Sequence, residues 1–573
     1  MRTPFARPLT VALSAALTIG FLFLAGRPAA ANGKVTIVNG NDPGVGFNDP
    51  TPVAPVGGNP MTTRGAQRLF AFQYAAELWA ETIDSPVEII VLATFEPLGA
   101  NVLGSAGALA AFRDFTGVGL APGPEFTGTW YGAALADKRA GENLANLSPD
   151  IRARFSSDFN FYLGVDTNHG ALNDLVTVVL HELGHGLNFQ TFVTTSTGAN
   201  LGTSTANPLG FTDIYARHLF DQKIGLHWND MTADERKSSA LHFGDLVWDG
   251  AVVTRDIPDV LVFGSPEVRV TAPSSIAGLY QFGTAAFGPA VGHPDISSTI
   301  VAATDAANTA GPATTDGCTA FTNAAAVVGK VALVERGTCG FAVKARNATN
   351  AGAAAVIIYN NAANATAAAP GMADDGVNGA FVTIPSVSLS RPDGLTVLGA
   401  LPASADIRVD PTLRAGADAL NRARLYAPTL LATGSSVSHF DTIAFRNLLM
   451  EPNINPDLTH NLSAPYDLTL ELFRDIGWFA DADLDGIADA ADCEAHSERT
   501  ATVVIDGEDT GVPNTLFTNG CTISDLVSDI AADAKNHGGY VSGVAHLTNS
   551  LVKAGLISGA QKGAIQSAAA HSN

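Results

Sequence analysis

Residues 172–189, LNDLVTVVLHELGHGLNF, constrain the fold of this chain more than any other segment. Apolar residues occur around almost the whole circumference of this segment, which predicts a helix buried on all sides. Asn173 or Asp174 can cap its first turn. Three polar residues, His181, Glu182 and His185, nevertheless stand in the middle of it. Burying such side chains costs free energy unless they are paired or bind a ligand, so the fold must supply a partner for them.

The spacing His181-Glu182-Leu183-Gly184-His185 suits one metal ion. Histidines at positions i and i+4 lie on the same helical face, so both imidazoles can reach a single tetrahedral Zn2+. In such a motif zinc lowers the pKa of a bound water and polarises a carbonyl, while the glutamate accepts the proton and returns it. The alternative is two hydrogen-bonded core histidines beside a capped glutamate. The motif favours a zinc peptidase with Glu182 as the general base.

The third ligand must come from a more distant residue. The histidines downstream of the helix are His218, His227, His242, His293, His439 and His460. His439 belongs to SHFDTIAFRNLLMEP, in which Met450 follows eleven residues later. Together with the HELGH helix and the later LTLELFRDIGWF, this segment resembles the leishmanolysin-type metzincins. In that family a long insertion separates the zinc helix from the third histidine.

The resemblance implies that His439 is the third zinc ligand and that Met450 forms a hydrophobic floor beneath the metal. The metzincin pattern has Gly and His where this chain has Asn188 and Thr191. Because Asn tolerates a left-handed turn better than most residues, the sharp exit from the helix can be kept. A glutamate ligand from a second helix is the alternative, although no helix offers an obvious one.

The upstream half also resembles a metzincin. Apolar spacing predicts a helix between residues 62 and 83, and residues 87–95 (VEIIVLATF) predict a buried strand. Segments 32–60 and 96–132 are rich in Gly and Pro and predict irregular structure, with a helix resuming at Ala133. The resemblance implies a mixed sheet above the zinc, with substrate bound as an extra strand along its edge.

Residues 273–410 differ in composition, with short strand-like runs separated by Ala, Gly, Asn and Thr. The run GKVALVERGTCGFAVKARNATNAGAAAVIIYNN, followed by VTIPSVSLSRPDG, resembles the protease-associated (PA) domain. This small α/β unit is found inserted in secreted peptidases and sorting receptors, where it restricts or directs substrate access. Residues 411–479 then return to helical patterning.

The first 31 residues have the three-part form of a secretory signal peptide. Arg2 and Arg7 precede an uncharged run from Leu9 to Gly26, and the segment ends in Ala29-Ala30-Ala31. A retained membrane anchor is the alternative. No later segment is apolar enough to span a bilayer. These features predict a secreted protein, either extracellular or in the cell envelope.

An exported protein meets an oxidising environment, in which cysteines form disulfides, and the chain has an even number of them, four. The pairs that lie close in sequence are Cys318 with Cys339 and Cys493 with Cys521, and we expect these two disulfides. No cysteine precedes His181, so a latent form of the enzyme would need another block on the zinc. A carboxylate or the segment 32–61 could provide it.

An acidic loop follows the helical region. Asp481, Asp483, Asp485, Gly486, Asp489 and Asp492 stand at positions 1, 3, 5, 6, 9 and 12 of a calcium loop, and Ile487 at position 7 would contribute its carbonyl. The alternative is a solvated acidic linker. Residues 494–573 are Ala-rich with helical periodicity and carry no catalytic constellation.

Composition limits the partners. The 573 residues carry 55 Asp and Glu against 32 Lys and Arg, a net charge of −23 that becomes −26 once residues 1–31, with three Arg and no acid, are removed. Such a chain is not expected to bind nucleic acid, because phosphate binding depends on Lys and Arg. Protein or peptide substrates remain.

The sequence thus predicts an α+β protein of several units. A signal peptide (1–31) precedes a catalytic domain in two parts (32–272 and 411–480) that is interrupted by the PA domain (273–410), and a calcium-binding loop (481–493) and a helical module (494–573) follow. The predicted activity is that of a secreted zinc endopeptidase. The alternatives are an inactive binding or adhesion protein and a two-zinc aminopeptidase, although the consecutive Glu pair of the latter is absent from this chain.

Overall fold

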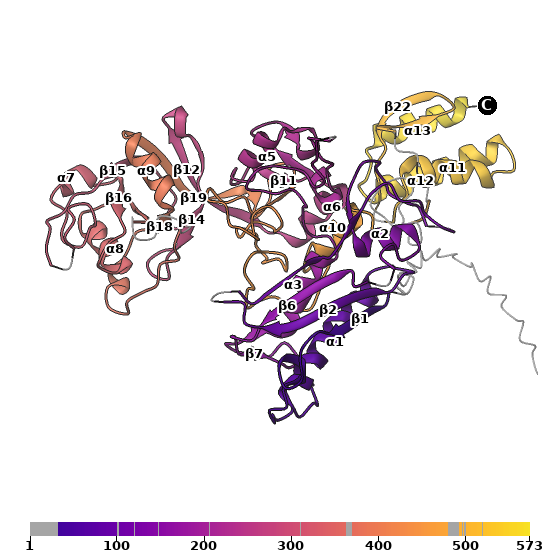
Figure 1. Ribbon diagram of the computed structural model, residues 1–573. Coiled ribbons are helices and arrows are strands. Elements are labelled where there is room, and N and C mark those ends of the chain that lie inside the picture. Colours follow the sequence, from indigo (N-terminus) through magenta and orange to yellow (C-terminus); the bar gives the residue numbers. More distant parts are fainter. Residues whose placement is uncertain are drawn as a thin grey trace, which may run out of the picture.

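The computed structural model describes residues 33–99, 102–119, 121–146, 148–205, 207–309, 311–361, 369–479, 492–494, 497, 500–517 and 519–572. The predicted signal peptide lies outside the described residues, as do the calcium-loop positions Asp481, Asp483, Asp485, Ile487 and Asp489. Figure 1 shows a central body, an inserted unit joined to it by the long strands β12 and β19, and a C-terminal module.

The central body is built on a four-stranded sheet with the order β1-β2-β6-β3. Its strands are β1 (Val35–Asn39), β2 (Ile89–Glu96), β6 (Ile151–Ser156) and β3 (Gly104–Ala108). The first three are parallel, and β3 is an antiparallel strand at one edge. The strand predicted at residues 87–95 is confirmed as β2. The predictions of irregular structure for 32–60 and 96–132 are wrong at β1 and β3, because pairing with β2 and β6 overrides the local Gly and Pro signals.

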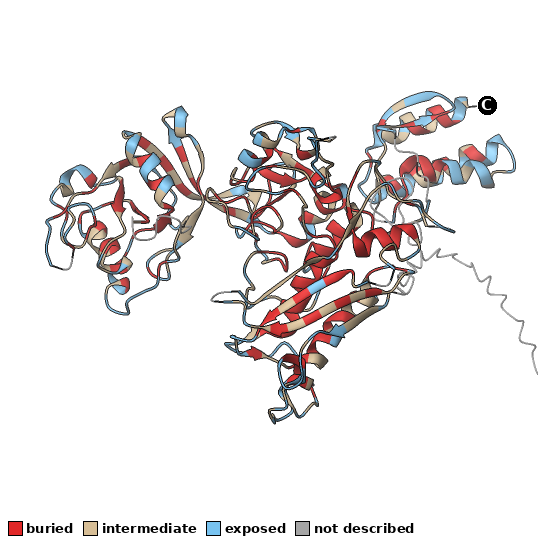
Figure 2. Cartoon of the chain, viewed as in Figure 1, coloured by how far each residue is buried: buried red, intermediate tan, exposed pale blue. Residues whose placement is uncertain are grey.

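Helices α1 (Arg64–Thr82) and α3 (Leu175–Gly186) pack against each other and against this sheet. The Thr63 side chain caps α1 and the Asp174 side chain caps α3, each accepting a hydrogen bond from the first turn. Every residue of α3 is buried, as the apolar pattern predicts (Figure 2). The indole Nε1 of Trp79 donates to the Leu180 carbonyl at 3.2 Å and so fixes α1 against α3.

Short elements complete the central body. Its other helices are α2 (Ala133–Ala140), α4 (Ile214–Arg217), α5 (Ala233–Ser239), α6 (Ala251–Val260) and α10 (Thr469–Asp475), with 3-10 turns η1 (Gly46–Asn48) and η2 (Trp228–Asp230). A second sheet has the order β10-β9-β11-β20, with β9 Leu219–Asp221, β10 Leu226–His227, β11 Leu246–Trp248 and β20 Ala423–Arg424. Two small ladders pair β4 (Ala111–Phe112) with β5 (Tyr131–Gly132) and β7 (Phe161–Tyr162) with β8 (Asn173–Asp174).

The prediction of helical structure for residues 411–479 is wrong over most of that stretch. Only α10 is an α-helix in this stretch, and the apolar Phe440, Leu448 and Leu449 are buried in irregular backbone. Buried carboxylates hold this backbone instead: Asp467 accepts from the Leu449 amide at 2.6 Å, and Asp441 accepts from the Ile443 amide at 3.0 Å. Side chains of this kind compete with helical hydrogen bonds.

The inserted unit contains an eight-stranded sheet with the order β13-β12-β19-β15-β16-β17-β18-β14. Its strands are β12 (Phe263–Ala272), β13 (Gly278–Leu279), β14 (Phe282–Thr284), β15 (Ile296–Ala302), β16 (Val331–Glu335), β17 (Ala355–Tyr359), β18 (Ser386–Leu389) and β19 (Ala403–Arg414). Its helices are α7 (Ala324–Val327), α8 (Phe341–Asn350) and α9 (Arg391–Gly399), with 3-10 turns η3 (Ser274–Ile276) and η5 (Gly379–Phe381). Helices α8 and α9 contribute to separate apolar cores.

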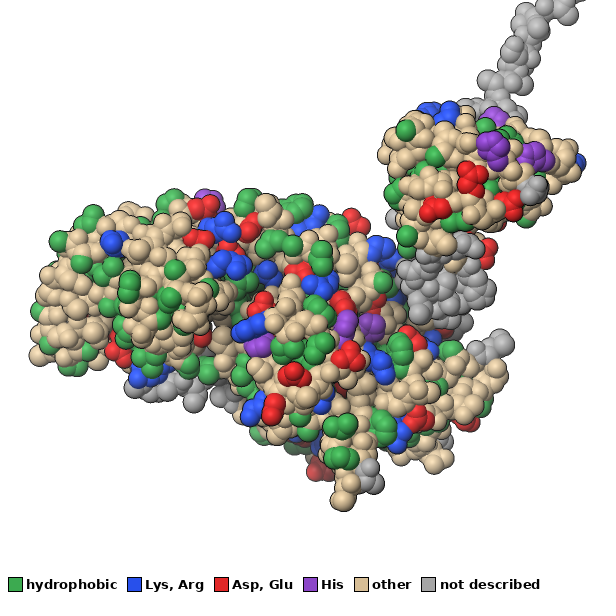
Figure 3. All heavy atoms as spheres, turned by 90° about the horizontal axis from the view of Figure 1, so that it is seen from above, with side chains coloured by type: hydrophobic (Ala, Val, Ile, Leu, Met, Phe, Trp, Pro, Cys, Tyr) green, Lys and Arg blue, Asp and Glu red, His purple; other side chains and the backbone are tan. Residues whose placement is uncertain are grey.

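The inserted sheet reaches beyond the boundaries 273 and 410 that composition predicts. Strand β12 begins at Phe263 and β19 ends at Arg414, and both belong to the sheet. The parts of these strands outside the predicted boundaries carry polar residues such as Glu267, Arg269 and Arg414, so their composition does not mark them as part of the inserted unit. On the face seen in Figure 3, the inserted unit presents mainly uncharged side chains.

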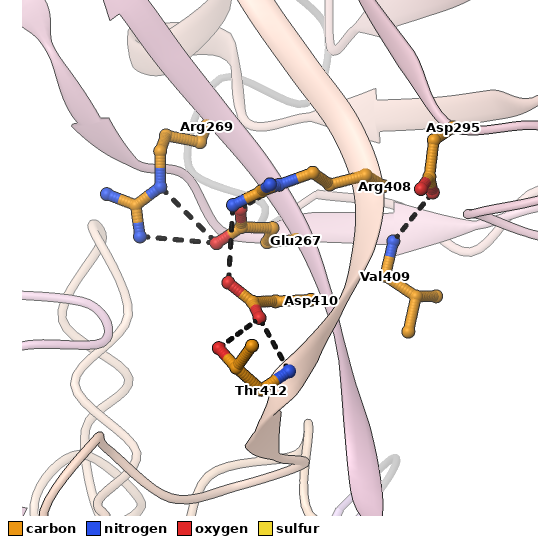
Figure 4. A network of polar contacts seen from close by, with 7 residues as sticks. All are labelled: Glu267, Arg269, Asp295, Arg408, Val409, Asp410 and Thr412. Carbon is orange, nitrogen blue, oxygen red and sulfur yellow. Dashed lines mark hydrogen bonds and ion pairs between the residues drawn. The ribbon is translucent and has the colours of Figure 1, made fainter.

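An ion-pair network fastens the two connecting strands (Figure 4). The buried carboxylate of Glu267 lies 2.7 Å from Arg408 and 3.2 Å from Arg269, and Arg408 also reaches Asp410 at 3.2 Å. Glu267 and Arg408 are directly opposite each other in the β12–β19 ladder. An oppositely charged cross-strand pair favours one register of two strands, so the network holds β12 and β19 in register.

The C-terminal module contains a hairpin as well as the predicted helices. Strands β21 (Thr502–Ile505) and β22 (Glu508–Pro513) precede α11 (Ile523–Asp533), α12 (His537–Lys553) and α13 (Gly559–His571). Asp506 and Gly507 join the strands with φ of 49° and 81°. Asp-Gly with positive φ at both positions is typical of a type I′ hairpin turn, so the sequence did carry a signal for it.

The disulfides join Cys318 to Cys339 and Cys493 to Cys521, the pairs that are close in sequence. The first lies within the inserted unit. The second links the start of the C-terminal module to the residue before the Thr522 cap of α11. Within the described residues, no helix combines the length and the apolar character that crossing a bilayer requires.

We expect the central body to fold without the inserted unit, because the two ends of the insertion meet. The Ala415 amide donates to the Val262 carbonyl at 2.9 Å, and the Arg414 side chain donates to the Leu261 carbonyl. Replacing residues 263–414 by a short Gly-Ser linker should therefore leave one cooperative thermal transition and the metal content unchanged, measured by calorimetry and metal analysis. Loss of both would show that the insertion is part of the central core.

Candidate metal centre

Helix α3 carries three polar side chains in a buried segment. Its N-terminus is fixed by Asp174, whose carboxylate accepts from the amide and the hydroxyl of Thr177. Its exit is fixed by Asn188, which has a φ of 88° and accepts from the Gly132 amide. The left-handed turn expected at Asn188 is confirmed. This turn brings the Phe189 carbonyl back to the His185 side chain.

The structure brings three histidines together across the whole insertion. The Nε2 atoms of His181, His185 and His439 lie 3.2, 3.2 and 3.3 Å from one another. Imidazole nitrogens that hold one tetrahedral zinc at about 2.0–2.1 Å stand roughly 3.3–3.4 Å apart. The triangle has the size that one such ion requires.

The other ring nitrogen of each histidine is bound to a backbone carbonyl. His181 Nδ1 contacts Leu449 O at 2.7 Å, His185 Nδ1 contacts Phe189 O at 2.8 Å, and His439 Nδ1 contacts Ser435 O at 2.7 Å. Because a carbonyl can only accept, each Nδ1 carries the proton, and each Nε2 presents a lone pair. Three lone pairs then point at one another, an arrangement that a cation stabilises. Carbonyl partners of this kind orient the ligands of metal sites.

Burial keeps these imidazoles neutral. Loss of hydration lowers the pKa of His181 to about 4. Loss of hydration, with the nearby His181, lowers the pKa of His185 to about 3, and the pKa of His439 falls well below its ordinary value for the same causes. Neutral imidazole is the form that binds a metal. Within the described residues, these three form the only group of His, Cys, Asp and Glu suited to a metal ion, and no glutamate joins them.

Met450 lies beneath helix α3. It is fully buried, and a Cβ placed on Gly184 would stand 2.8 Å from its sulfur, so the helix and Met450 meet at a residue without a side chain. The Met450 carbonyl accepts from the Phe440 amide at 2.8 Å. The contact places Met450 under α3, and its role as a hydrophobic floor beneath a metal stays a prediction.

Two buried aspartates support the centre, and no spacing pattern along the chain predicts either of them. Asp467 holds the Leu449 amide, while the Leu449 carbonyl holds His181. Asp213 accepts from the Thr191 hydroxyl at 2.8 Å and from the Phe192 amide at 2.7 Å, which fixes the chain just after α3. Burial raises the pKa of each to about 6.

Glu182 is buried beside the histidines. Loss of hydration raises its pKa to about 8, and a hydrogen bond from the Ala106 backbone acts in the opposite direction. A Cβ on Gly104 would stand 2.8 Å from Glu182 Cγ and Oε1. The glycine on edge strand β3 therefore provides the space that the carboxylate occupies.

An open cleft of about 680 Å³ runs past the three histidines and Glu182. Its walls come from the β3 edge, one face of α3, the segment after α3, and the segments around 433–438 and 452–454. The lining residues are Val102, Leu103, Gly104, Ser105, Ala106, Val178, His181, Glu182, His185, Gln190, Thr191, Val193, Thr195, Thr433, Gly434, Ser435, Ser436, Ser438, His439, Pro452, Asn453 and Ile454.

The remaining candidate histidines lie elsewhere. His227 pairs with Asp249, His242 with Asp221, and His460 with Asp174. His218 stacks on Trp248 at 4.9 Å. His293 belongs to the inserted unit, where it precedes Pro294. Each of the first four therefore has a structural partner of its own.

Residues 33–61 lie away from the three histidines, which contradicts the role in latency that was considered for the segment 32–61. Strand β1 is at the opposite edge of the sheet from β3, and none of residues 33–61 lines the cleft. The Asn41 and Asn59 side chains tie this segment to the backbone of Phe95, Gln67 and Leu163. It is an integral part of the central body.

Asp492 is the one described residue among the predicted calcium ligands. Its Oδ1 accepts from the Glu494 amide at 3.0 Å, next to the Cys493–Cys521 disulfide. The other positions fall outside the described residues, so the calcium site stays a prediction.

Gly104→Ala should slow the predicted peptide hydrolysis and should leave the zinc content unchanged. Its Cβ would displace the Glu182 carboxylate, and a misplacement of about 1 Å can cost on the order of 100-fold in rate. Metal content and kcat measure the two effects. Gly107→Ala on the same strand is the matched control, because its Cβ would meet only the Gln190 side chain, at 3.2 Å. Equal loss in both variants would contradict a specific role for Gly104.

His439→Ala should abolish stoichiometric zinc binding, because two imidazoles alone leave the metal site incomplete. Metal analysis after dialysis measures the effect. His227→Ala, a change at a half-exposed histidine paired with Asp249, should retain zinc. Full zinc occupancy in His439→Ala would assign the third ligand to another residue.

Comparison with known protein families identifies one part of the chain. Residues 298–397 match the PA domain family, so the chain contains a PA domain within the inserted unit. The match covers a minority of the chain, and it confirms the resemblance described for this region.

Short stretches are similar to curated proteins. Human ER degradation-enhancing alpha-mannosidase-like protein 3 is 42% identical over 89 residues, 15% of this chain and 10% of that protein. An aminopeptidase of Pseudomonas aeruginosa (strain UCBPP-PA14) is 53% identical over 51 residues, 9% of this chain and 10% of that protein. The chain thus matches about a tenth of the length of these relatives.

Solved structures are similar over limited parts. BSAP, a zinc aminopeptidase from Bacillus subtilis, has a TM-score of 0.19 and 21% identity, covering 31% of this chain and 38% of that chain. A subtilisin-like protease, Apa1 of an Antarctic Pseudoalteromonas, has a TM-score of 0.19 and 20% identity, covering 26% and 34%. The similar proteins are named for different activities, so these similarities do not indicate which reaction this chain catalyses.

Proposed function

We propose that this protein is a zinc-dependent endopeptidase with a catalytic domain of the leishmanolysin-like metzincin type. One observation carries the proposal: three neutral histidines present their Nε2 atoms within 3.3 Å of one another, beside a buried glutamate, in an open cleft. The PA domain and the short similarity to an aminopeptidase support a peptide hydrolase.

His181, His185 and His439 would hold the zinc, and Met450 would support the helix from below. The bound zinc would supply Lewis acidity at the scissile carbonyl and acidify the attacking water. Glu182 would accept the proton of the attacking water and would return it to the leaving amine. Its raised pKa of about 8 is the value without the cation; a nearby positive charge favours the carboxylate and so lowers the pKa.

Substrate would bind as an additional strand along β3. This strand pairs with β6 on one side and lies at the edge of the sheet, where it lines the cleft. Backbone groups at such an edge can pair with an extended peptide whatever its sequence. The small residues Gly104 and Ala106 allow the peptide to approach Glu182 closely.

The cleft favours internal peptide bonds over chain ends. An aminopeptidase needs a negative group to hold the free α-ammonium of its substrate, and Glu182 is the only acidic residue among those described that line the cleft. In the part of the chain that the structure describes, the one cluster suited to a metal is these three histidines, and it suits one ion rather than two. An aminopeptidase is the second candidate, on the strength of the similarity to the Pseudomonas aeruginosa enzyme alone.

The two disulfides fit an oxidising compartment, either outside the cell or in a secretory lumen. Secretion through the predicted signal peptide is the route we propose. The intact Glu182 argues against an inactive binding protein built on the same scaffold.

Glu182→Gln should retain zinc and lose activity on the order of 100- to 10,000-fold, because the amide cannot accept the proton. Hydrolysis of a broad protein substrate and of peptides blocked at both ends, with and without a chelator, measures it. The native protein should cut blocked peptides internally. Stepwise release of amino acids from free N-termini alone would favour the aminopeptidase, and undiminished hydrolysis by Glu182→Gln would refute the mechanism.

A further inference from the structure

We propose that Tyr215 and Ser438 are positioning residues of the metal centre. They hold Val437 in a strained backbone conformation, and this conformation directs the third histidine, His439, at the other two. The inference rests on the proposed function, because it takes His439 as a ligand of the zinc.

Val437 adopts a backbone conformation that valine rarely takes. Its φ is 76°, in the left-handed region, where a branched side chain crowds the following carbonyl. The other non-glycine residues with positive φ among those described are Asp, Asn or Thr, whose polar side chains can hydrogen-bond the local backbone. Val437 is apolar and fully buried, so its own side chain offsets none of the strain. A strained residue of this kind persists only where its surroundings hold it, and such residues cluster at functional sites.

Both backbone polar groups of Val437 are held. The Tyr215 hydroxyl donates to the Val437 carbonyl at 3.0 Å, and the Val437 amide donates to the Tyr426 carbonyl at 2.7 Å. The Tyr426 amide also donates to the His439 carbonyl at 2.9 Å, so one residue holds both ends of the segment 437–439. Of these contacts, the one from Tyr215 is made by a side chain, so a substitution can remove it.

The turn at Val437 brings the Ser435 carbonyl to the ring of His439. His439 Nδ1 contacts Ser435 O at 2.7 Å, although the two residues are four positions apart. This contact orients the ring so that its Nε2 faces those of His181 and His185, at 3.3 and 3.2 Å. If φ of Val437 relaxed to the negative values that valine prefers, the carbonyl and the ring would separate. The strain is therefore linked to the direction of the third ligand.

Ser438 ties the same segment to the exit of α3. The Thr191 amide, just after that helix, donates to Ser438 Oγ at 3.2 Å, and the Thr191 hydroxyl donates to Asp213 at 2.8 Å. Asp213 is the cap residue of α4, the short helix that carries Tyr215. The segment around His439 is thus joined to the helix with the other two histidines by two routes, which meet at α4.

Tyr215→Phe should weaken zinc binding by about tenfold or more, because loss of a partner that orients metal ligands typically costs 10- to 100-fold in affinity. The zinc dissociation constant of the full-length protein, measured by competition with a chromophoric chelator, gives the effect without an assay of activity. Tyr280→Phe is the matched control. Tyr280 is also buried, and its hydroxyl donates to the Ile276 carbonyl at 2.9 Å within the inserted unit, so zinc affinity should stay native.

Glycine at position 437 should rescue Tyr215→Phe. Glycine takes a positive φ without strain, so the segment can keep its shape when the Tyr215 hydroxyl is absent. In the Tyr215→Phe background, Val437→Gly should restore zinc affinity to within about threefold of the native value, whereas Val437→Ala, which keeps a Cβ, should restore little. If Tyr215 only stabilised the core, glycine would add flexibility and weaken binding further.

Native zinc affinity in Tyr215→Phe, or equal effects of glycine and alanine at position 437, would overturn the inference and leave the zinc site in place. If Tyr215→Phe does not fold, Ser438→Ala takes its place, with an expected loss of about tenfold; unchanged affinity there overturns the inference. A native chain that binds no zinc would overturn both proposals. The expected order of zinc affinities in a protein that hydrolyses no peptide would support the positioning role and overturn the endopeptidase proposal alone.

Discussion

The convergence of three unprotonated imidazole nitrogens in a water-poor interior is the constraint on which the rest of the central body depends. Such nitrogens repel one another unless a cation stands between them, and each needs a fixed tautomer. The tautomers are set by three carbonyls, those of Leu449, Phe189 and Ser435, which come from three different segments. The turn after α3, the Met450 segment and the loop before His439 must therefore all be in place together.

This requirement explains the buried acids around the centre. A carboxylate inside a protein is costly unless it accepts hydrogen bonds, and here each one holds irregular backbone that has no ladder of its own. Asp467 holds the Leu449 segment and Asp213 holds the exit of α3. The free energy spent on their burial fixes carbonyls and amides whose positions the metal site depends on.

The insertion is compatible with this geometry because its first and last residues are attached to the central body next to each other. His185 and His439 are 254 residues apart in sequence, yet their ring nitrogens are 3.2 Å apart. The paired strands β12 and β19, with Glu267 between Arg269 and Arg408, carry the PA domain on a double-stranded connection. The return strand leads toward the segment that lines the cleft from Thr433 onward, and Thr429, which precedes that segment, donates to Asp393 of α9 at 2.7 Å. This contact links the PA domain to the stretch of chain that leads into the wall of the site.

The sequence by itself determined the buried helix, the spacing of His181 and His185 with Glu182 between them, and the strand at 87–95, because these depend on local periodicity or on residues a few positions apart. It pointed to the PA domain and to His439 through family resemblances. Tertiary structure alone decided that His439 meets the helix, that Gly104 makes room for Glu182, that Asp213 and Asp467 fix the backbone, and that β1 and β3 join the sheet. These features depend on contacts between distant segments, and the neighbouring residues carry no periodic pattern that predicts them. The Gly-rich strand β3 is stabilised by pairing with β6. His439 reaches the other two histidines only because the chain returns to α3 after the insertion.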